Sequence, residues 1–168
     1  MARKVFKVAL FTIAFGCTLF LIYGIVEKAA AKKQIQSKVR MLPETKFFAM
    51  DSSIYSFPSS ALAIVFFNSG CEHCRYELEQ ISKKLQLFSN KELILLSSEN
   101  IATIKKTSEG LGLSNLPNIH FTKINPTDVF DTFGSLSVPH VFIYGNDQKL
   151  IKEFKGETKI EAIAEYLP

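Results

Sequence analysis

The sequence predicts an α/β domain in which helices flank a mixed central sheet, preceded by one transmembrane helix. Two observations support this prediction. From residue 43 onward, short runs rich in β-branched and aromatic residues alternate with segments of helical periodicity. Near the amino terminus, 19 residues from Val8 to Val26 carry no charge, and a helix of that length spans roughly 30 Å at about 1.5 Å per residue.

Composition and charge separate the amino-terminal segment from the rest of the chain. With 47% apolar and 21% charged residues among 168, the chain has the composition of one globular domain with an appendage. Residues 1–42 hold eight of the 20 Lys and Arg residues and one acid, a net charge of +7, whereas residues 43–168 have a net charge of −3. The basic residues flank the apolar segment, which argues against a nucleic-acid partner.

Four segments follow from this division. They are a basic tail (1–7), a transmembrane anchor (8–26), a charged stalk (27–42) and an α/β domain (43–168). The anchor would make the lipid bilayer a partner of the chain. The length of the apolar run favours an uncleaved anchor over a secretory signal, although residues 29–31 offer an Ala-x-Ala cleavage site.

The elements of the domain follow in a regular order. A hairpin is expected over 44–60, with a turn at 51–53. Residues 61–67 have the composition of a strand buried on both faces. Apolar residues then recur at spacings of four and three from Cys74 to Phe88, as in a helix of about five turns. The later elements are a strand (92–97), a helix (101–113), a strand (118–124), a helix opened by Thr127, a strand (140–144), a hairpin strand (150–155) and a helix capped by Thr158.

A Cys-x-x-Cys pair, Cys71 and Cys74, stands at the start of the helix that follows the first strand. Ser69 and Glu72 have the spacing of a capping box at that point. The Cys71 sulfur would then face free backbone N–H groups and the positive end of the helix dipole, which both favour the thiolate. Cys74 lies one turn further on, within the apolar stripe. An exposed nucleophile with a shielded second thiol suits thiol–disulfide exchange.

Other uses of the cysteine pair stay open. A structural zinc site would need two more ligands, and the sequence has no second Cys-x-x-Cys and no His-x-x-x-His. No metal is therefore expected, although a soft ion such as Cu(I), held by both cysteines with His73 or His140, is the alternative function. A purely structural disulfide is a further possibility. A peroxidase is disfavoured because no Thr-x-x-Cys arrangement surrounds Cys71.

The cysteine pair after a buried strand and Val138-Pro139 before the strand at 140–144 resemble the TlpA/ResA-like family of membrane-anchored thioredoxins. The resemblance covers roughly residues 43–168, and the positions of Glu77 and Gly156 also match. It implies a thioredoxin-like fold, thiol–disulfide oxidoreductase activity, and no cofactor beyond a redox-active disulfide between the two cysteines.

The resemblance also implies roles for particular residues. In this family the proline at the position of Pro139 is cis and faces the disulfide, and the backbone at Val138 pairs with an extended substrate. Glu77 would accept the proton of Cys74 during resolution. From its spacing alone, Glu77 could equally be a solvated residue beside the apolar stripe.

The family further implies partners and a location. The clients would be exported proteins that bear disulfides, apocytochrome c among them, and a membrane thiol donor would re-reduce the pair. We therefore expect a single-pass protein of the inner membrane whose domain faces the periplasm or the cell exterior. The charges beside the anchor slightly favour the opposite orientation, but a tethered dithiol domain is most useful in an oxidising compartment.

Three features depart from the family pattern. Gly70 precedes the first cysteine, where an aromatic residue is usual, and His140 follows the proline, where Thr is common. The dipeptide between the cysteines is Glu72-His73. His73 would stabilise a nearby thiolate and Glu72 would repel it, so both are expected to tune the reduction potential.

Overall fold

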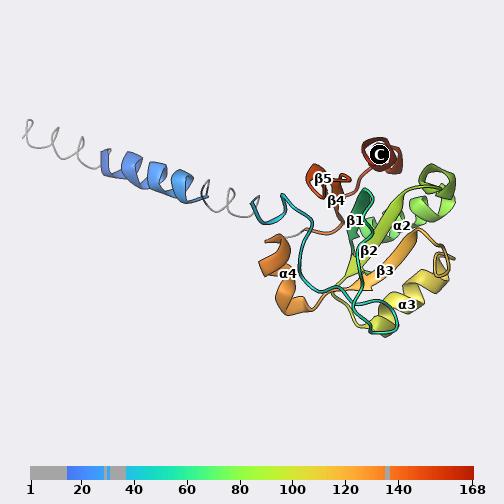
Figure 1. Cartoon of the computed structure of the whole chain (residues 1–168). Helices are drawn as coiled ribbons and strands as arrows, with labels where there is room; N and C mark the ends of the chain where they lie inside the picture. Colours follow the sequence, from blue (N-terminus) through green and yellow to red (C-terminus); the bar gives the residue numbers. More distant parts are fainter. Residues whose placement is uncertain (1–14, 29, 31–36, 135–136) are drawn as a thin grey trace, which may run out of the picture. The chain divides into compact units, whose positions relative to one another are not determined.

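The computed structural model describes residues 15–28, 30, 37–134 and 137–168 (Figure 1). The chain divides into two units, Met1–Ser37 and Lys38–Pro168. In the first unit, residues 15–28 are helical and expose apolar side chains such as Phe20. The predicted anchor at 8–26 and stalk at 27–42 lie partly outside the described residues. Within the described part of the chain, no helix has both the length and the apolar character needed to cross a membrane.

The second unit contains one five-stranded mixed sheet, as predicted. Its strand order is β3-β2-β1-β4-β5. The first three strands are parallel, and β4 and β5 are antiparallel to their neighbours. In chain order the elements are β1 (Leu62–Phe66), α2 (Glu72–Lys83), the 3-10 helix η1 (Leu85–Phe88), β2 (Glu92–Ser97), α3 (Ile101–Gly110), β3 (Ile119–Lys123), α4 (Pro126–Phe133), β4 (His140–Tyr144), β5 (Leu150–Lys155) and α5 (Ile160–Tyr166).

Both faces of the sheet are covered, which explains why β1 is apolar at every position. One face packs against α2, α3 and α5 through the buried side chains Leu78, Ile81, Ile104, Ile160 and Ile163. On the other face, the Phe133 ring of α4 stacks on Phe142 of β4 with centroids 5.1 Å apart, and Phe47 lies in the same cluster. The two cores pack against both sides of β1, and α2 begins shortly after the carboxyl end of that strand.

The segment at 44–60 forms less of a hairpin than predicted. Phe48 and Ile54 make a single antiparallel bridge around the turn. Phe48 also pairs with Lys123 through two backbone hydrogen bonds of 2.8 Å. The segment therefore attaches to the edge of β3, and this contact replaces a longer pairing of the segment with itself.

Two predictions about helix boundaries were wrong. The first helix stops at Lys83 and does not continue to Phe88, because Lys84 leaves the helical region with φ −125° and the chain tightens into η1. The 3-10 turn directs Phe88 into the core. The helix α4 begins at Pro126, one residue before the predicted Thr127, because the fixed φ of proline suits the first helical position.

The prediction that Thr158 caps the last helix is wrong. Lys159 occupies the N-cap position of α5. The Thr158 side chain donates instead to the carbonyl of Gly156, and its backbone N–H is used by the site described next.

Candidate active site

A short loop between β1 and α2 sets the position of Cys71. The N–H of Cys71 donates to the carbonyl of Asn68 at 3.1 Å, and the N–H of Gly70 donates to the Asn68 side chain at 2.9 Å. Cys71 is the N-cap residue of α2, with extended backbone angles. The helix therefore begins where the sequence predicted, which places the first cysteine at the helix N-terminus, where backbone N–H groups lack intrahelical partners.

The predicted capping box is wrong. No side chain caps α2, because the N-cap residue is Cys71 and not Ser69. Ser69 is instead bound by Glu99, two residues after β2. Both the N–H and the hydroxyl of Ser69 donate to the Glu99 carboxylate, at 2.8 and 2.6 Å. The Ser97 hydroxyl donates to the same carboxylate at 3.1 Å. Glu99 thus fixes the loop before Cys71, a role that no local sequence signal indicates.

The two cysteines differ in environment as predicted from their places on the helix. Both are free thiols; Cys71 is half-buried, whereas Cys74 is only 1% exposed. Burial, a hydrogen bond with Cys71 and the charges of Cys71 and Glu77 together raise the pKa of Cys74 to about 12, against a backbone hydrogen bond from Asn68 that lowers it. Cys74 therefore needs a proton acceptor before it can act as a nucleophile.

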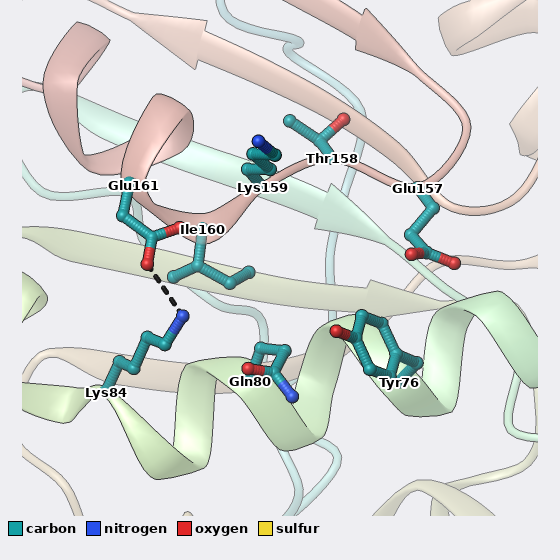
Figure 2. A pocket seen from close by; sticks show the side chains of 8 residues that line it. All are labelled: Tyr76, Gln80, Lys84, Glu157, Thr158, Lys159, Ile160 and Glu161. Atoms are coloured by element: carbon teal, nitrogen blue, oxygen red, sulfur yellow. Dashed lines mark hydrogen bonds and ion pairs between the residues drawn. The ribbon is translucent and has the colours of Figure 1, made fainter.

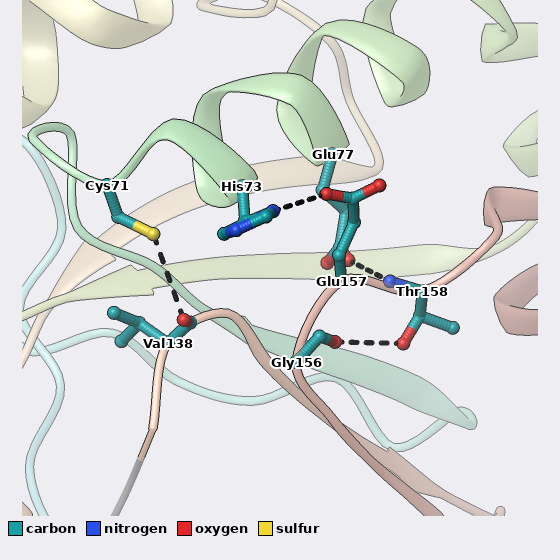
Figure 3. Close-up of polar contacts among 7 residues, drawn as sticks. All are labelled: Cys71, His73, Glu77, Val138, Gly156, Glu157 and Thr158. Carbon is teal, nitrogen blue, oxygen red and sulfur yellow. Dashed lines mark hydrogen bonds and ion pairs between the residues drawn. The ribbon is translucent and has the colours of Figure 1, made fainter.

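Val138 and Pro139 lie against the first cysteine. The peptide bond between them is cis, as the family resemblance implied. The Cys71 thiol donates to the carbonyl of Val138 at 3.7 Å (Figure 3). The carbonyl of Pro139 accepts from the N–H of Gly156 at 2.9 Å. The turn after β5 thus holds the proline segment in place beside the sulfur.

Glu77 is buried at 1% exposure, so the solvated alternative for this residue is wrong. Its Oε2 accepts a hydrogen bond of 2.8 Å from the N–H of Thr158. Its Oε1 has no hydrogen-bond partner within the described part of the chain. Burial and the charge on Glu157 raise the pKa of Glu77, and the Thr158 amide lowers it; the net pKa is about 7. A carboxyl with such a pKa can exchange a proton near neutral pH.

Glu72 and His73, which lie between the two cysteines, are both exposed. Nδ1 of His73 lies 2.7 Å from Oε2 of Glu157, in the turn after β5 (Figure 3). This partner of His73 could not be found from the sequence, because 84 positions separate the two residues.

His140 is buried on the face of the sheet opposite Cys74. Its ring stacks on Phe142 at 4.4 Å, and Phe142 belongs to the core cluster that does not contain Cys74. Nε2 of His140 lies 2.8 Å from Glu153, and burial lowers the pKa of His140. Among the described residues, no group of three His, Cys, Asp or Glu side chains is placed to hold a metal ion. Among these residues the copper-binding alternative therefore has no third ligand beside the two cysteines.

A groove of about 760 Å³ runs beside the site, between α2 and the start of α5 (Figure 2). Tyr76 and Gln80 line it from α2, and Glu157 and Thr158 line it from the turn after β5. A Lys84–Glu161 ion pair of 2.6 Å joins its two sides at the far end.

Comparisons with known proteins agree with this geometry. No protein-family model matches the chain. The chain is 21% identical to the thiol-disulfide oxidoreductase ResA of Bacillus cereus, over 98% of its own length and 95% of the relative, and equally to ResA of Bacillus thuringiensis. Its fold is similar to that of StoA from Bacillus subtilis, with a TM-score of 0.58 and 14% identity over 72% of this chain and 93% of that one. The thioredoxin domain of a thiol-disulfide oxidoreductase from Bacteroides vulgatus gives a TM-score of 0.61 at 13% identity, over 77% and 97%.

The fold is thioredoxin-like, and with the near full-length relatives the paired cysteines mark the chain as a thiol–disulfide oxidoreductase. Within that class, the near full-length relatives confirm the resemblance to the TlpA/ResA-like family.

Proposed function

We propose that this oxidoreductase is membrane-anchored and reduces disulfides of exported proteins through Cys71 and Cys74. One observation carries the proposal: a half-buried thiol at a helix N-terminus is followed, one turn later, by a thiol that is only 1% exposed. A client disulfide can reach the first sulfur but not the second. The two cysteines therefore act in a fixed order.

The exchange has two steps. The Cys71 thiolate attacks one sulfur of the client disulfide, the client S–S bond breaks, and one client sulfur leaves as a thiolate. Cys74 then gives its proton to Glu77 and attacks the Cys71 sulfur, which releases the second client thiolate. The client gains two electrons, and the chain is left with a Cys71–Cys74 disulfide.

The residues around the cysteines have supporting roles in this proposal. An extended client segment pairs with the backbone at Val138, beside Pro139, because that carbonyl already faces the Cys71 sulfur. Glu77 accepts the proton of Cys74, since its Oε1 is unpaired in the described structure and its pKa is about 7. Glu72 and His73 tune the reduction potential as exposed charges near the reactive sulfur.

The location and partners follow from the sequence. The uncharged segment at 8–26 anchors the chain in the inner membrane with the domain facing the periplasm or cell exterior, where client disulfides form. A membrane thiol donor returns the Cys71–Cys74 disulfide to the dithiol. Apocytochrome c, with its Cys-x-x-Cys-His motif, is the client class that the family resemblance favours.

Trapping variants test the order of the cysteines. With Cys74→Ser, the mixed disulfide cannot be resolved, so covalent complexes with clients should accumulate and dissolve in a thiol reductant. With Cys71→Ser, few or none should form, because buried Cys74 lacks access and its thiolate is disfavoured. Mass spectrometry of the trapped proteins would separate a cytochrome route, with one or two clients, from a general reductase. If neither variant traps a client while the wild type binds one copper ion through both sulfurs, the metal-binding function replaces this proposal.

A further inference from the structure

The three-residue turn at 156–158, which follows β5, contacts three separate parts of the site. Figure 3 shows its contacts with Glu77 and His73. The N–H of Gly156 donates to Pro139, the N–H of Thr158 donates to Glu77, and the carboxylate of Glu157 pairs with His73. Gly156 has φ +83°, a left-handed conformation that favours glycine. One short turn therefore joins the proline segment, the buried carboxyl and the cysteine dipeptide.

Glu157, in this turn, interacts with charged groups of the site on two sides. Glu157 pairs with His73 at 2.7 Å, and its negative charge also raises the pKa of Glu77. A protonated His73 offsets the charge on Glu157, whereas a neutral His73 leaves that charge to act on Glu77. The dipeptide between the cysteines is thus connected to the buried carboxyl through Glu157.

We propose that Glu157 is a positioning residue that couples His73 to Glu77, so that the charge on His73 governs when Glu77 accepts the proton of Cys74. The inference rests on the proposed role of Glu77 in resolution. It assigns a function to a residue outside the Cys-x-x-Cys motif, and it gives His73 a target other than the Cys71 sulfur.

Other charged groups near Glu77 are accounted for. Cys74 lies on the same helix, and the charge on Glu77 raises the pKa of Cys74. From the side of α5, Glu161 is held by Lys84 in an ion pair at the far end of the groove, and Lys159 lines that groove. The side chains of His73 and Glu157 are 70% and 40% exposed, so their pairing contributes little to stability. Substitution of either residue should leave the fold intact.

Direct titration of Glu77 tests the coupling. The full chain, reduced and held in detergent micelles, is labelled with ¹³C at Glu carboxyl carbons, and Glu77→Gln identifies the Glu77 signal. Glu157→Gln removes a neighbouring negative charge. The midpoint of the Glu77 titration should therefore fall by about 0.5 to 1 pH unit. His73→Gln should raise the midpoint in the wild-type background and leave it unchanged in the Glu157→Gln background. Glu161→Gln, a matched removal of charge on the same groove, should leave the midpoint in place.

The same variants allow a kinetic test of the coupling. If the titration midpoint of Glu77 falls by that amount, resolution of a mixed disulfide by Glu157→Gln should be about three- to fivefold faster than wild type at pH 6 and nearly equal to it at pH 8. An unmoved midpoint in Glu157→Gln, or an effect of His73→Gln that persists without Glu157, would overturn the coupling. If the midpoints move as expected while Glu77→Gln exchanges at the wild-type rate, the coupling stands and the proton-acceptor role of Glu77 falls.

Discussion

The backbone N–H of Thr158 donates a 2.8 Å hydrogen bond to Oε2 of Glu77, and this is the hydrogen bond that holds the carboxyl inside the domain. The carboxyl is buried, with a pKa raised by burial to about 7 from its usual 4.5. Below pH 4.5 the group is protonated in the folded and unfolded chains alike, so it has no effect on their difference. As pH rises to 7, the unfolded chain releases the proton first and the folded state loses stability.

Glu77→Gln should therefore remove a pH-dependent destabilisation. The free energy of unfolding of the variant minus that of the wild type should increase by about 1 to 3 kcal/mol between pH 4 and pH 8. Denaturant unfolding of the reduced proteins at several pH values measures this difference. Glu79→Gln, which removes an exposed carboxylate paired with Lys83, serves as the control and should show no such trend.

The same substitution should slow catalysis. Without a proton acceptor, Cys74 with its pKa of about 12 should resolve a mixed disulfide about 10²- to 10⁴-fold more slowly. Stopped-flow measurement of the release of a chromogenic thiol from a preformed mixed disulfide on Cys71 isolates this step. Equal rates in the variant and the wild type from pH 6 to pH 8 would exclude Glu77 as the acceptor.

Glu99 should stabilise the loop that presents Cys71. Glu99→Gln replaces a carboxylate oxygen with an NH₂ group that faces donors of Ser69 and Ser97. The loss should be about 1 to 3 kcal/mol of unfolding free energy, with faster hydrogen exchange at the Ser69 amide. Glu109→Gln, an exposed residue of α3, is the matched control. Unchanged amide exchange at Ser69 would show that the loop is held by other contacts.

The orientation of the domain can be tested by labelling. In a Cys17→Ser background, an impermeant thiol reagent should modify Cys71 in intact cells with a permeabilised outer membrane, after mild reduction. Cys74 should stay unlabelled because it is buried. Labelling that requires lysis of the inner membrane would place the domain in the cytoplasm and remove exported proteins from its clients.

Local signals in the sequence were enough to predict the positions of most strands of the sheet. The predicted ranges of β2, β4 and β5 agree with the structure, because short apolar runs bounded by turn residues reflect burial within the sheet. The position of Cys71 at the start of α2 was likewise readable, since a strand, a break and an amphipathic run occur in direct succession.

Helix ends and caps were harder to predict from the sequence. Ser69 and Thr158 both have the residue type of a cap, yet Ser69 bonds to Glu99 and the Thr158 amide bonds to Glu77. A hydroxyl or amide forms its hydrogen bond with whichever partner the fold brings close, and sequence spacing shows only the local partners.

The sequence by itself determined the order of strands and helices, the Cys-x-x-Cys pair and the contrast between an exposed first thiol and a shielded second one, because each depends on residues within a few positions of one another. Only the tertiary structure decided the environment of that pair. Glu99 reaches Ser69 across 30 positions, Thr158 reaches Glu77 across 81, and Glu157 reaches His73 across 84. Such contacts arise when the sheet brings the end of β2 and the turn after β5 beside α2, and they set the burial and charge that govern the pKa of Glu77.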